Sequence, residues 1–78
     1  MNVPDDRFAS NLEICFEILL YLSSRMAKVA PGDLFEFISG DPTAVDKIPT
    51  WCESRDFSLC AADPLPDGRW RFLIQKPE

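Results

Sequence analysis

The sequence predicts a small α/β protein: a two-layer α/β sandwich in the order β-α-β-α-β-β, with a weak or missing first strand. Three observations lead to this prediction. Apolar residues recur at helical spacing in residues 11–28, runs rich in aromatic and aliphatic residues occupy residues 34–39 and 57–76, and an Asp-Pro pair marks a helix start between them. Because such short elements can build only one core, we expect residues 1–78 to form a single domain.

The N-terminal segment is the weakest candidate strand. Residues 3–9 contain a proline and two aspartates, which strands disfavour. The first helix is predicted over about residues 11–28, where Ser10 and Glu13 have the spacing of a capping box. Its apolar positions recur every three or four residues, at Leu12, Phe16, Leu19, Leu22, Met26 and Val29. The Ala-Pro-Gly that follows ends the helix.

A short strand and a second helix come next. Residues 34–39, "LFEFIS", are rich in aromatic and aliphatic residues and lie between two glycines, which predicts a strand. Asp41 can then cap a helix, and Pro42 suits its first position because no N–H is needed there. The helix should therefore begin directly after the strand.

The face of this second helix that points to the core is predicted from its spacing. Three residues at i, i+3 and i+7 define that face, and the helix should end near Ser54: Val45, Ile48 and Cys52. Pro49 lies inside the helix and cannot donate to the carbonyl of Val45. We expect a kink or a break there, unless the residues on both sides still pack.

The last third of the chain predicts a β-hairpin. Residues 57–62 and 69–76 alternate in polarity, and the intervening "DPLPDG" is typical of a turn. The faces expected to point inward carry Phe57, Leu59, Ala61, Trp70, Phe72 and Ile74. The opposite face, with Arg69, Arg71 and Gln75, is expected to keep the sheet soluble.

Composition excludes several classes of function. A net charge of -5 would repel phosphate backbones, so we expect no nucleic acid partner. Two acids near the N-terminus and short aliphatic runs predict neither export nor a membrane span, and hence a cytoplasmic protein. The chain has no histidine, no CxxC pair and no Gly-rich phosphate loop, so we expect no metal site and no ordinary hydrolase or kinase chemistry. Any chemistry would be thiol chemistry.

A larger pattern resembles a known family. Pro31-Gly32-Asp33, Asp41-Pro42, Ile48-Pro49 and the terminal basic Lys76 together resemble the TusA/SirA-like sulfur-carrier family. The distance from Cys15 to the Pro-Gly turn also matches, so the resemblance covers about residues 15–76. It implies a sandwich whose reactive cysteine opens the first helix in a Cys-Pro-x-Pro motif and carries a persulfide between proteins. By position that cysteine is Cys15.

The chain departs from the motif at both prolines, because it reads Cys15-Phe16-Glu17-Ile18. Proline in the first turn presets φ and would force the helix to begin just after the cysteine, which leaves the thiol at the positive end of the helix dipole. Nothing comparable in this sequence forces that start. The chemistry of Cys15 therefore depends on where the helix begins.

Two hypotheses follow. If the helix begins at Cys15, the chain is a sulfur carrier that relays persulfide sulfur between a donor and an acceptor protein, with no metal or organic cofactor. If it begins earlier, Cys15 lies among leucines, where a thiol is inert. The chain would then be a catalytically inactive TusA-like binding or regulatory module, docking a partner or a second copy as a homodimer through Phe16, Ile18 and Tyr21.

The other two cysteines favour simpler roles. Cys52 completes the apolar face of the second helix and is expected to be packing. Cys60 lies in the middle of a predicted strand, where it should be about half exposed, and has no basic neighbour in sequence. We assign it no catalytic role.

Overall fold

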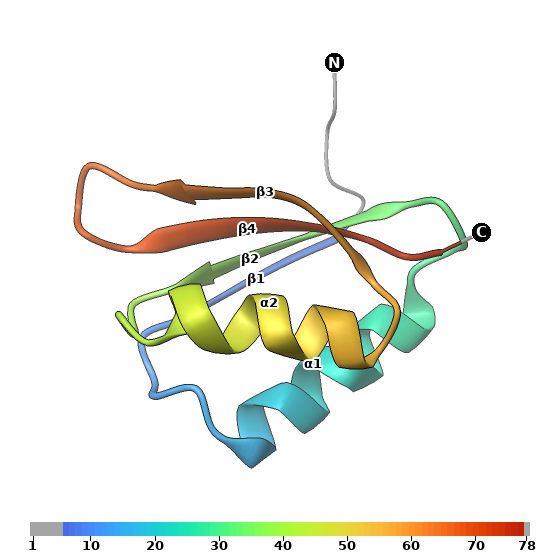
Figure 1. Cartoon of the computed structure of the whole chain (residues 1–78), viewed down its shortest axis with the longest axis horizontal. Coiled ribbons are helices and arrows are strands. Elements are labelled where there is room, and N and C mark those ends of the chain that lie inside the picture. The colour runs from blue at the N-terminus through green and yellow to red at the C-terminus, as the bar shows by residue number, and fades with distance from the viewer. Residues whose placement is uncertain (1–5, 78) are drawn as a thin grey trace.

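The computed structural model describes residues 6–77 as one four-stranded sheet covered on one face by two helices (Figure 1). The elements are β1 (Asp6–Ser10), α1 (Phe16–Lys28), β2 (Leu34–Ser39), α2 (Ala44–Ser54), β3 (Ser58–Pro64) and β4 (Trp70–Gln75). The strand order is β1-β2-β4-β3, in which β1 runs parallel to β2 and the other neighbours are antiparallel. The predicted β-α-β-α-β-β sandwich is confirmed.

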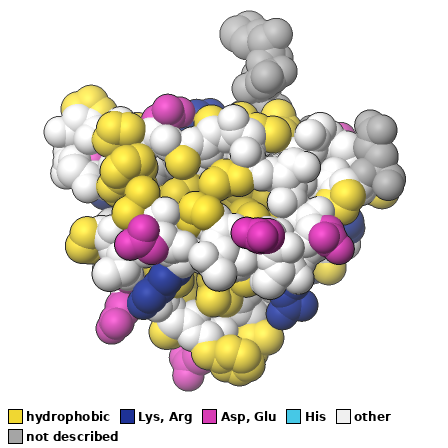
Figure 2. All heavy atoms as spheres, in the orientation of Figure 1, with side chains coloured by type: hydrophobic (Ala, Val, Ile, Leu, Met, Phe, Trp, Pro, Cys, Tyr) yellow, Lys and Arg dark blue, Asp and Glu magenta, His cyan; other side chains and the backbone are white. Residues whose placement is uncertain are grey.

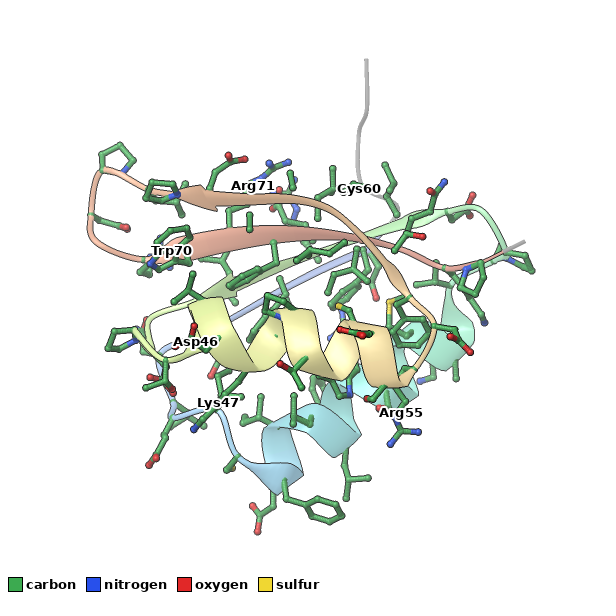
Figure 3. The ribbon with its side chains drawn as sticks, viewed as in Figure 1. Asp46, Lys47, Arg55, Cys60, Trp70 and Arg71 are labelled. Atoms are coloured by element: carbon green, nitrogen blue, oxygen red, sulfur yellow. The ribbon has the colours of Figure 1, made fainter. Side chains whose placement is uncertain are left out.

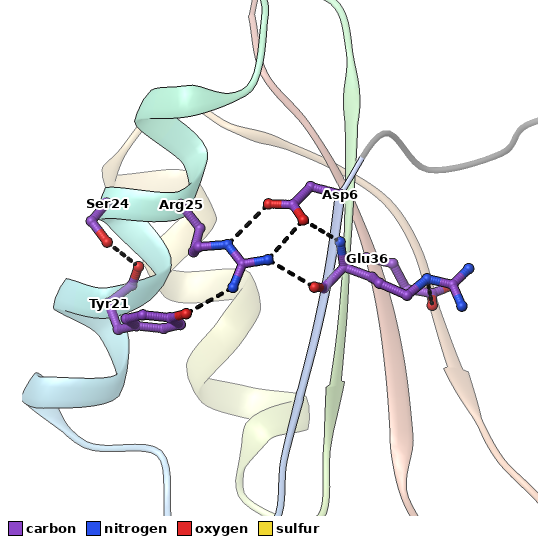
Figure 4. A network of polar contacts seen from close by, with 6 residues as sticks. Asp6, Tyr21, Ser24, Arg25 and Glu36 are labelled. Carbon is purple, nitrogen blue, oxygen red and sulfur yellow. Dashed lines mark hydrogen bonds and ion pairs between the residues drawn. The ribbon is translucent and has the colours of Figure 1, made fainter.

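The first strand is present, although the sequence predicts it only weakly; residues 3–5 of the prediction lie outside the described residues. Arg25 of α1 links this strand to the helix layer through hydrogen bonds. Its guanidinium donates to both carboxylate oxygens of Asp6, at 2.9 and 2.7 Å, and to the carbonyl of Arg7 at 2.9 Å (Figure 4). Phe8 packs beside it, with its ring centroid 4.8 Å from that of Tyr21. The clamp uses residues far apart in sequence, so local propensity does not reveal it.

The core lies between the sheet and the two helices. Its buried members are Ile14, Leu22, Met26, Val29, Phe35, Phe37, Ala44, Ile48, Trp51, Cys52, Phe72 and Ile74. Three residues predicted to point inward are exposed instead: Leu12 at 66%, Phe16 at 74% and Val45 at 36%. Ile14, which the helical pattern had skipped, is buried in their place.

Helix α2 continues through Pro49 without a break, which is the exception that the prediction allowed for residues that pack on both sides. Residues on both sides of the proline pack into the core, since Ile48 is fully buried and Trp51 is 5% exposed. Burial of these side chains offsets the loss of one hydrogen bond to the Val45 carbonyl. The helix ends at Ser54, as predicted.

The predicted hairpin of β3 and β4 is confirmed, but its register shifts at Cys60. Leu59 pairs with Ile74 and Ala61 pairs with Leu73, so Cys60 is the extra residue of a β-bulge. The bulge moves Ala61 to the face of the sheet that carries no helix. The prediction that Ala61 shares the inward face of Leu59 is therefore wrong.

The face of the sheet away from the helices carries a buried ion pair. Glu36, 6% exposed, accepts a hydrogen bond from Arg71 at 2.6 Å, and Arg7 lies 3.7 Å away. Arg71 thus neutralises a buried carboxylate as well as keeping the face polar, while Arg69 pairs with Asp67 within the hairpin loop. None of the helices within residues 6–77 is long and apolar enough to cross a membrane.

The clamp on β1 predicts a stability effect that can be measured. Arg25→Met keeps the aliphatic stem but removes the guanidinium from Asp6, which then keeps the N–H of Arg7 as a donor, so we expect a loss of about 1–3 kcal/mol in the free energy of unfolding. Amide hydrogens of residues 6–10 should also exchange faster. Arg69→Met is the matched control: its pair with Asp67 is 38% and 52% exposed, and its removal should cost less than about 0.5 kcal/mol. Equal losses from the two variants would contradict this account.

Candidate functional site

Cys15 is exposed and stands directly ahead of α1. Its backbone is extended, with φ of -139° and ψ of 178°, and its carbonyl accepts the first helical hydrogen bond from the N–H of Leu19 at 3.0 Å. The thiol therefore belongs to the end of the helix where the first N–H groups have no helical acceptor. The predicted start near residue 11 is wrong.

The predicted capping box does not form. Ser10 is the last residue of β1, and its hydroxyl oxygen accepts the N–H of Leu12 at 3.0 Å in the loop that follows. Residues 11–15 form the connection from the sheet to the helix layer. Because Ser10 is engaged in the strand and this loop, it cannot cap α1.

Asp41, predicted as a cap for α2, also holds the chain ahead of α1. One of its carboxylate oxygens accepts the N–H of Ile14 at 2.6 Å, and the other accepts the N–H of Thr43 at 2.9 Å. These N–H groups, that of Ile14 first, hold the pKa of Asp41 below its ordinary value. Helix α2 begins at Ala44, two residues beyond the predicted Pro42, with Thr43 in the cap position.

Lys47 completes the contact from α2. Its ammonium donates to the carbonyl of Ile14 at 2.9 Å, so both backbone polar groups of Ile14 are bound by residues 27 and 33 positions away. The side chain of Ile14 is 2% exposed and anchors the same residue in the core. We call Ile14, Asp41 and Lys47 the Ile14 clamp.

Gly40 allows the two loops to approach closely. A Cβ atom at this position would lie 2.6 Å from the side-chain oxygen of Asn11 and 3.2 Å from its Cα. The N–H of Gly40 also donates to the carbonyl of Ser10 at 2.9 Å. A larger residue would require the Asn11 side chain to move and its backbone to shift slightly.

A groove between α1 and α2 opens beside the clamp. It has a volume of about 520 Å³ and is lined by Leu19, Asp46, Lys47, Thr50, Trp51 and Ser54. Figure 3 shows Asp46 and Lys47 on the first turns of α2, on the helix side of the molecule. Among residues 6–77, the buried indole N–H of Trp51 has no acceptor.

The other two cysteines lie in different environments. Cys52 is 1% exposed, and burial raises the pKa of its thiol to about 12, which confirms the prediction that it is packing. Cys60 is exposed on β3, and Figure 3 places it on the opposite side of the molecule from Lys47. Within residues 6–77, no cluster of His, Cys, Asp or Glu could hold a metal ion.

The model of the family described as sulfurtransferase TusA matches residues 13–76, which is most of the chain and includes Cys15 and the Ile14 clamp. The chain belongs to the TusA sulfurtransferase family. Membership implies a sulfur-carrier or sulfurtransferase role that involves protein partners. This TusA-family chain lacks the motif prolines, yet its first helix begins immediately after the cysteine.

The sequence did not predict the Ile14 clamp. Asp41 carried a signal, since the Asp-Pro pair marked a helix start, but nothing indicated that its second oxygen would bind Ile14. Lys47 carried no signal, because its ammonium reaches Ile14 only once α2 lies beside the start of α1.

The lowered pKa of Asp41 predicts a pH dependence of stability. Asp41→Asn leaves a single acceptor oxygen, so either Ile14 or Thr43 loses its partner. The ionised carboxylate stabilises the fold at pH values above its ordinary pKa of about 3.9, and this contribution is lost as the pH falls through the lowered folded pKa. We expect the variant to be less stable near neutrality and the difference to shrink in acid. Urea unfolding over a pH series measures this, and a pH-independent difference would contradict it.

The role of Lys47 predicts a double-mutant result. Lys47→Met removes the ammonium from the Ile14 carbonyl, so the amide of Leu19, which bonds to Cys15, should exchange about tenfold faster. Phe16→Pro presets the first helical residue, as the family motif does, and Phe16 is exposed enough to be replaced.

In the Phe16→Pro background, Lys47→Met should leave exchange at Leu19 almost unchanged, because the proline makes the helix start independent of the clamp. Hydrogen exchange read by NMR in the four proteins of this cycle measures the coupling. If Lys47→Met accelerated exchange equally in both backgrounds, the clamp would not be what positions the helix start.

Proposed function

We propose that this chain is a sulfur carrier whose Cys15 relays sulfur between two proteins as a persulfide. The Cys15 thiolate attacks the outer sulfur of a persulfide on a donor protein. A new S–S bond forms at Cys15, the donor's S–S bond breaks, and the donor departs as a thiolate. The thiolate of an acceptor cysteine then takes the same sulfur from Cys15. The sulfur atom is transferred from one thiolate to another without net oxidation, so neither an oxidant nor a cofactor is needed in the carrier.

The observation that carries this proposal is the exposed Cys15 directly ahead of α1 in a chain of the TusA family. The first N–H groups of α1, which have no acceptor within the helix, and the positive end of the helix dipole lie at this position. Glu13 and Glu17, two residues to either side, oppose a negative charge. The backbone of α1 is therefore the main group available to stabilise the anion.

The alternative is an inactive module that docks a partner or a second copy through Phe16, Ile18 and Tyr21. It assumed a Cys15 enclosed among leucines. Two further observations weigh against a docking surface made of these three residues. Ile18 packs against the core, and the Tyr21 hydroxyl accepts a hydrogen bond from Arg25 at 2.7 Å. Phe16 alone of the three is highly exposed, at 74%.

Thiol labelling tests the proposal in a Cys60→Ser background, which removes the other exposed thiol. We expect iodoacetamide to modify Cys15 in the folded protein at about neutral pH, because this thiol is exposed. Buried Cys52 is the internal control and should react only after unfolding. Incubation with a persulfide donor should then add about 32 Da, one sulfur atom, and Cys15→Ser should abolish the addition. A Cys15 as slow as Cys52, or one that gains no sulfur, would exclude the sulfur-carrier role.

A further inference from the structure

We propose that the groove between α1 and α2, together with the apolar residues at its Cys15 end, binds the cysteine-bearing segment of the protein that exchanges sulfur with this chain. We infer that this segment is apolar next to its cysteine and basic on either side. The inference rests on the proposed function, because it names the surface that would hold a second sulfur atom at Cys15.

Two residues that line the groove also bond to backbone carbonyls at or next to Cys15. Lys47 lines it and bonds to the carbonyl of Ile14, the residue before Cys15, while Leu19 lines it from α1 and donates its N–H to the Cys15 carbonyl. Its volume of about 520 Å³ is within the range of sites that enclose a small ligand or several side-chain groups. An extended chain advances about 3.3 Å per residue, so residues within two or three positions of a cysteine held at Cys15 would reach the groove.

Three exposed apolar side chains lie within five residues of Cys15. Phe16 and Leu20 are 74% and 48% exposed and, four residues apart, lie on the same side of α1. Leu12, three residues before Cys15, is 66% exposed. Figure 2 shows hydrophobic side chains at the lower end of the molecule, where α1 begins in Figure 1, with acidic side chains near them. Single exposed apolar residues are ordinary, but three of them around a reactive residue indicate a surface that a partner covers.

The acidic residues near Cys15 favour a partner segment that is basic. Glu13 and Glu17 flank the thiol and are exposed, and Asp46 lines the groove. The ammonium of Lys47 is bound to the Ile14 carbonyl, and Arg55 lies at the far end of α2 (Figure 3). An acidic rim on a chain with a net charge of -5 attracts a basic segment and repels an acidic one.

Thiol–disulfide exchange with synthetic peptides tests the inference in the Cys60→Ser background. Each peptide carries one cysteine as a mixed disulfide with thionitrobenzoate; the first has leucine beside the cysteine and lysine outside, and the second has glycine and glutamate at those positions. Attack by Cys15 forms the protein–peptide disulfide and releases the coloured thiolate, which gives the rate constant. We expect the Leu-Lys peptide to react at least about tenfold faster.

Two variants separate the groove from the thiol. Thr50→Trp fills the groove from an exposed position in its wall and should slow the Leu-Lys peptide about tenfold, while alkylation by iodoacetamide stays unchanged. Ser58→Trp places the same side chain on exposed β3, outside the groove, and should change neither rate. Circular dichroism verifies that both variants are folded.

The outcomes distinguish the two proposals. If Cys15 gains sulfur from a persulfide donor but the two peptides react alike, or Thr50→Trp changes nothing, the groove is not the docking surface and the carrier function stands. If Cys15 gains no sulfur, both proposals fall together.

Discussion

The structure depends on one carboxylate. Asp41 accepts the N–H of Ile14 ahead of α1 and the N–H of Thr43 ahead of α2, so the starts of both helices are bound to the same side chain. Two backbone N–H groups that donate to a carboxylate favour the anion over the protonated form, which explains why the pKa of Asp41 is lowered. Lys47 binds the Ile14 carbonyl and supplies a positive charge nearby, so neither backbone polar group of this buried residue is left without a partner.

This arrangement explains how the chain can begin α1 at the same place as its family without the prolines. Proline acts locally, since it restricts φ at the first helical residues and removes a donor. The Ile14 clamp acts through the tertiary structure, because it binds the peptide groups just ahead of Cys15 and thereby keeps residues 11–15 out of the helix. The two devices leave the cysteine in the same location, and the clamp additionally makes that location depend on the packing of α2.

The three thiols show how strongly environment controls cysteine chemistry within one small protein. Cys52 is enclosed by the core, and burial keeps it protonated. Cys60 is exposed at a bulge of an edge strand, where its sulfur is 3.9 Å from both the Ser58 carbonyl oxygen and the side-chain oxygen of Gln75. Cys15 combines exposure with a helix N-terminus, and the groove proposed to bind a partner is lined in part by Leu19, one helical turn further along α1. The acidic groups near it would then act mainly in choosing that partner.

Local patterns in the sequence were sufficient for most of the fold. Residues 34–39, the end of α2 at Ser54, the hairpin and the fold class follow from periodicity and turn residues, because those signals arise between neighbours along the chain. The family resemblance predicted Cys15 as the sulfur-carrying cysteine. Neither could tell whether its thiol is enclosed or exposed.

That question was decided by contacts between distant segments. The start of α1 depends on Asp41 and Lys47, β1 on Arg25, and the continuity of α2 through Pro49 on core packing. In each case a tertiary hydrogen bond or buried side chain outweighs a local preference, because those interactions exist only once the sheet and the helices have come together. The position of the thiol at the tip of α1 is thus a property of the folded chain, which no window of its sequence contains.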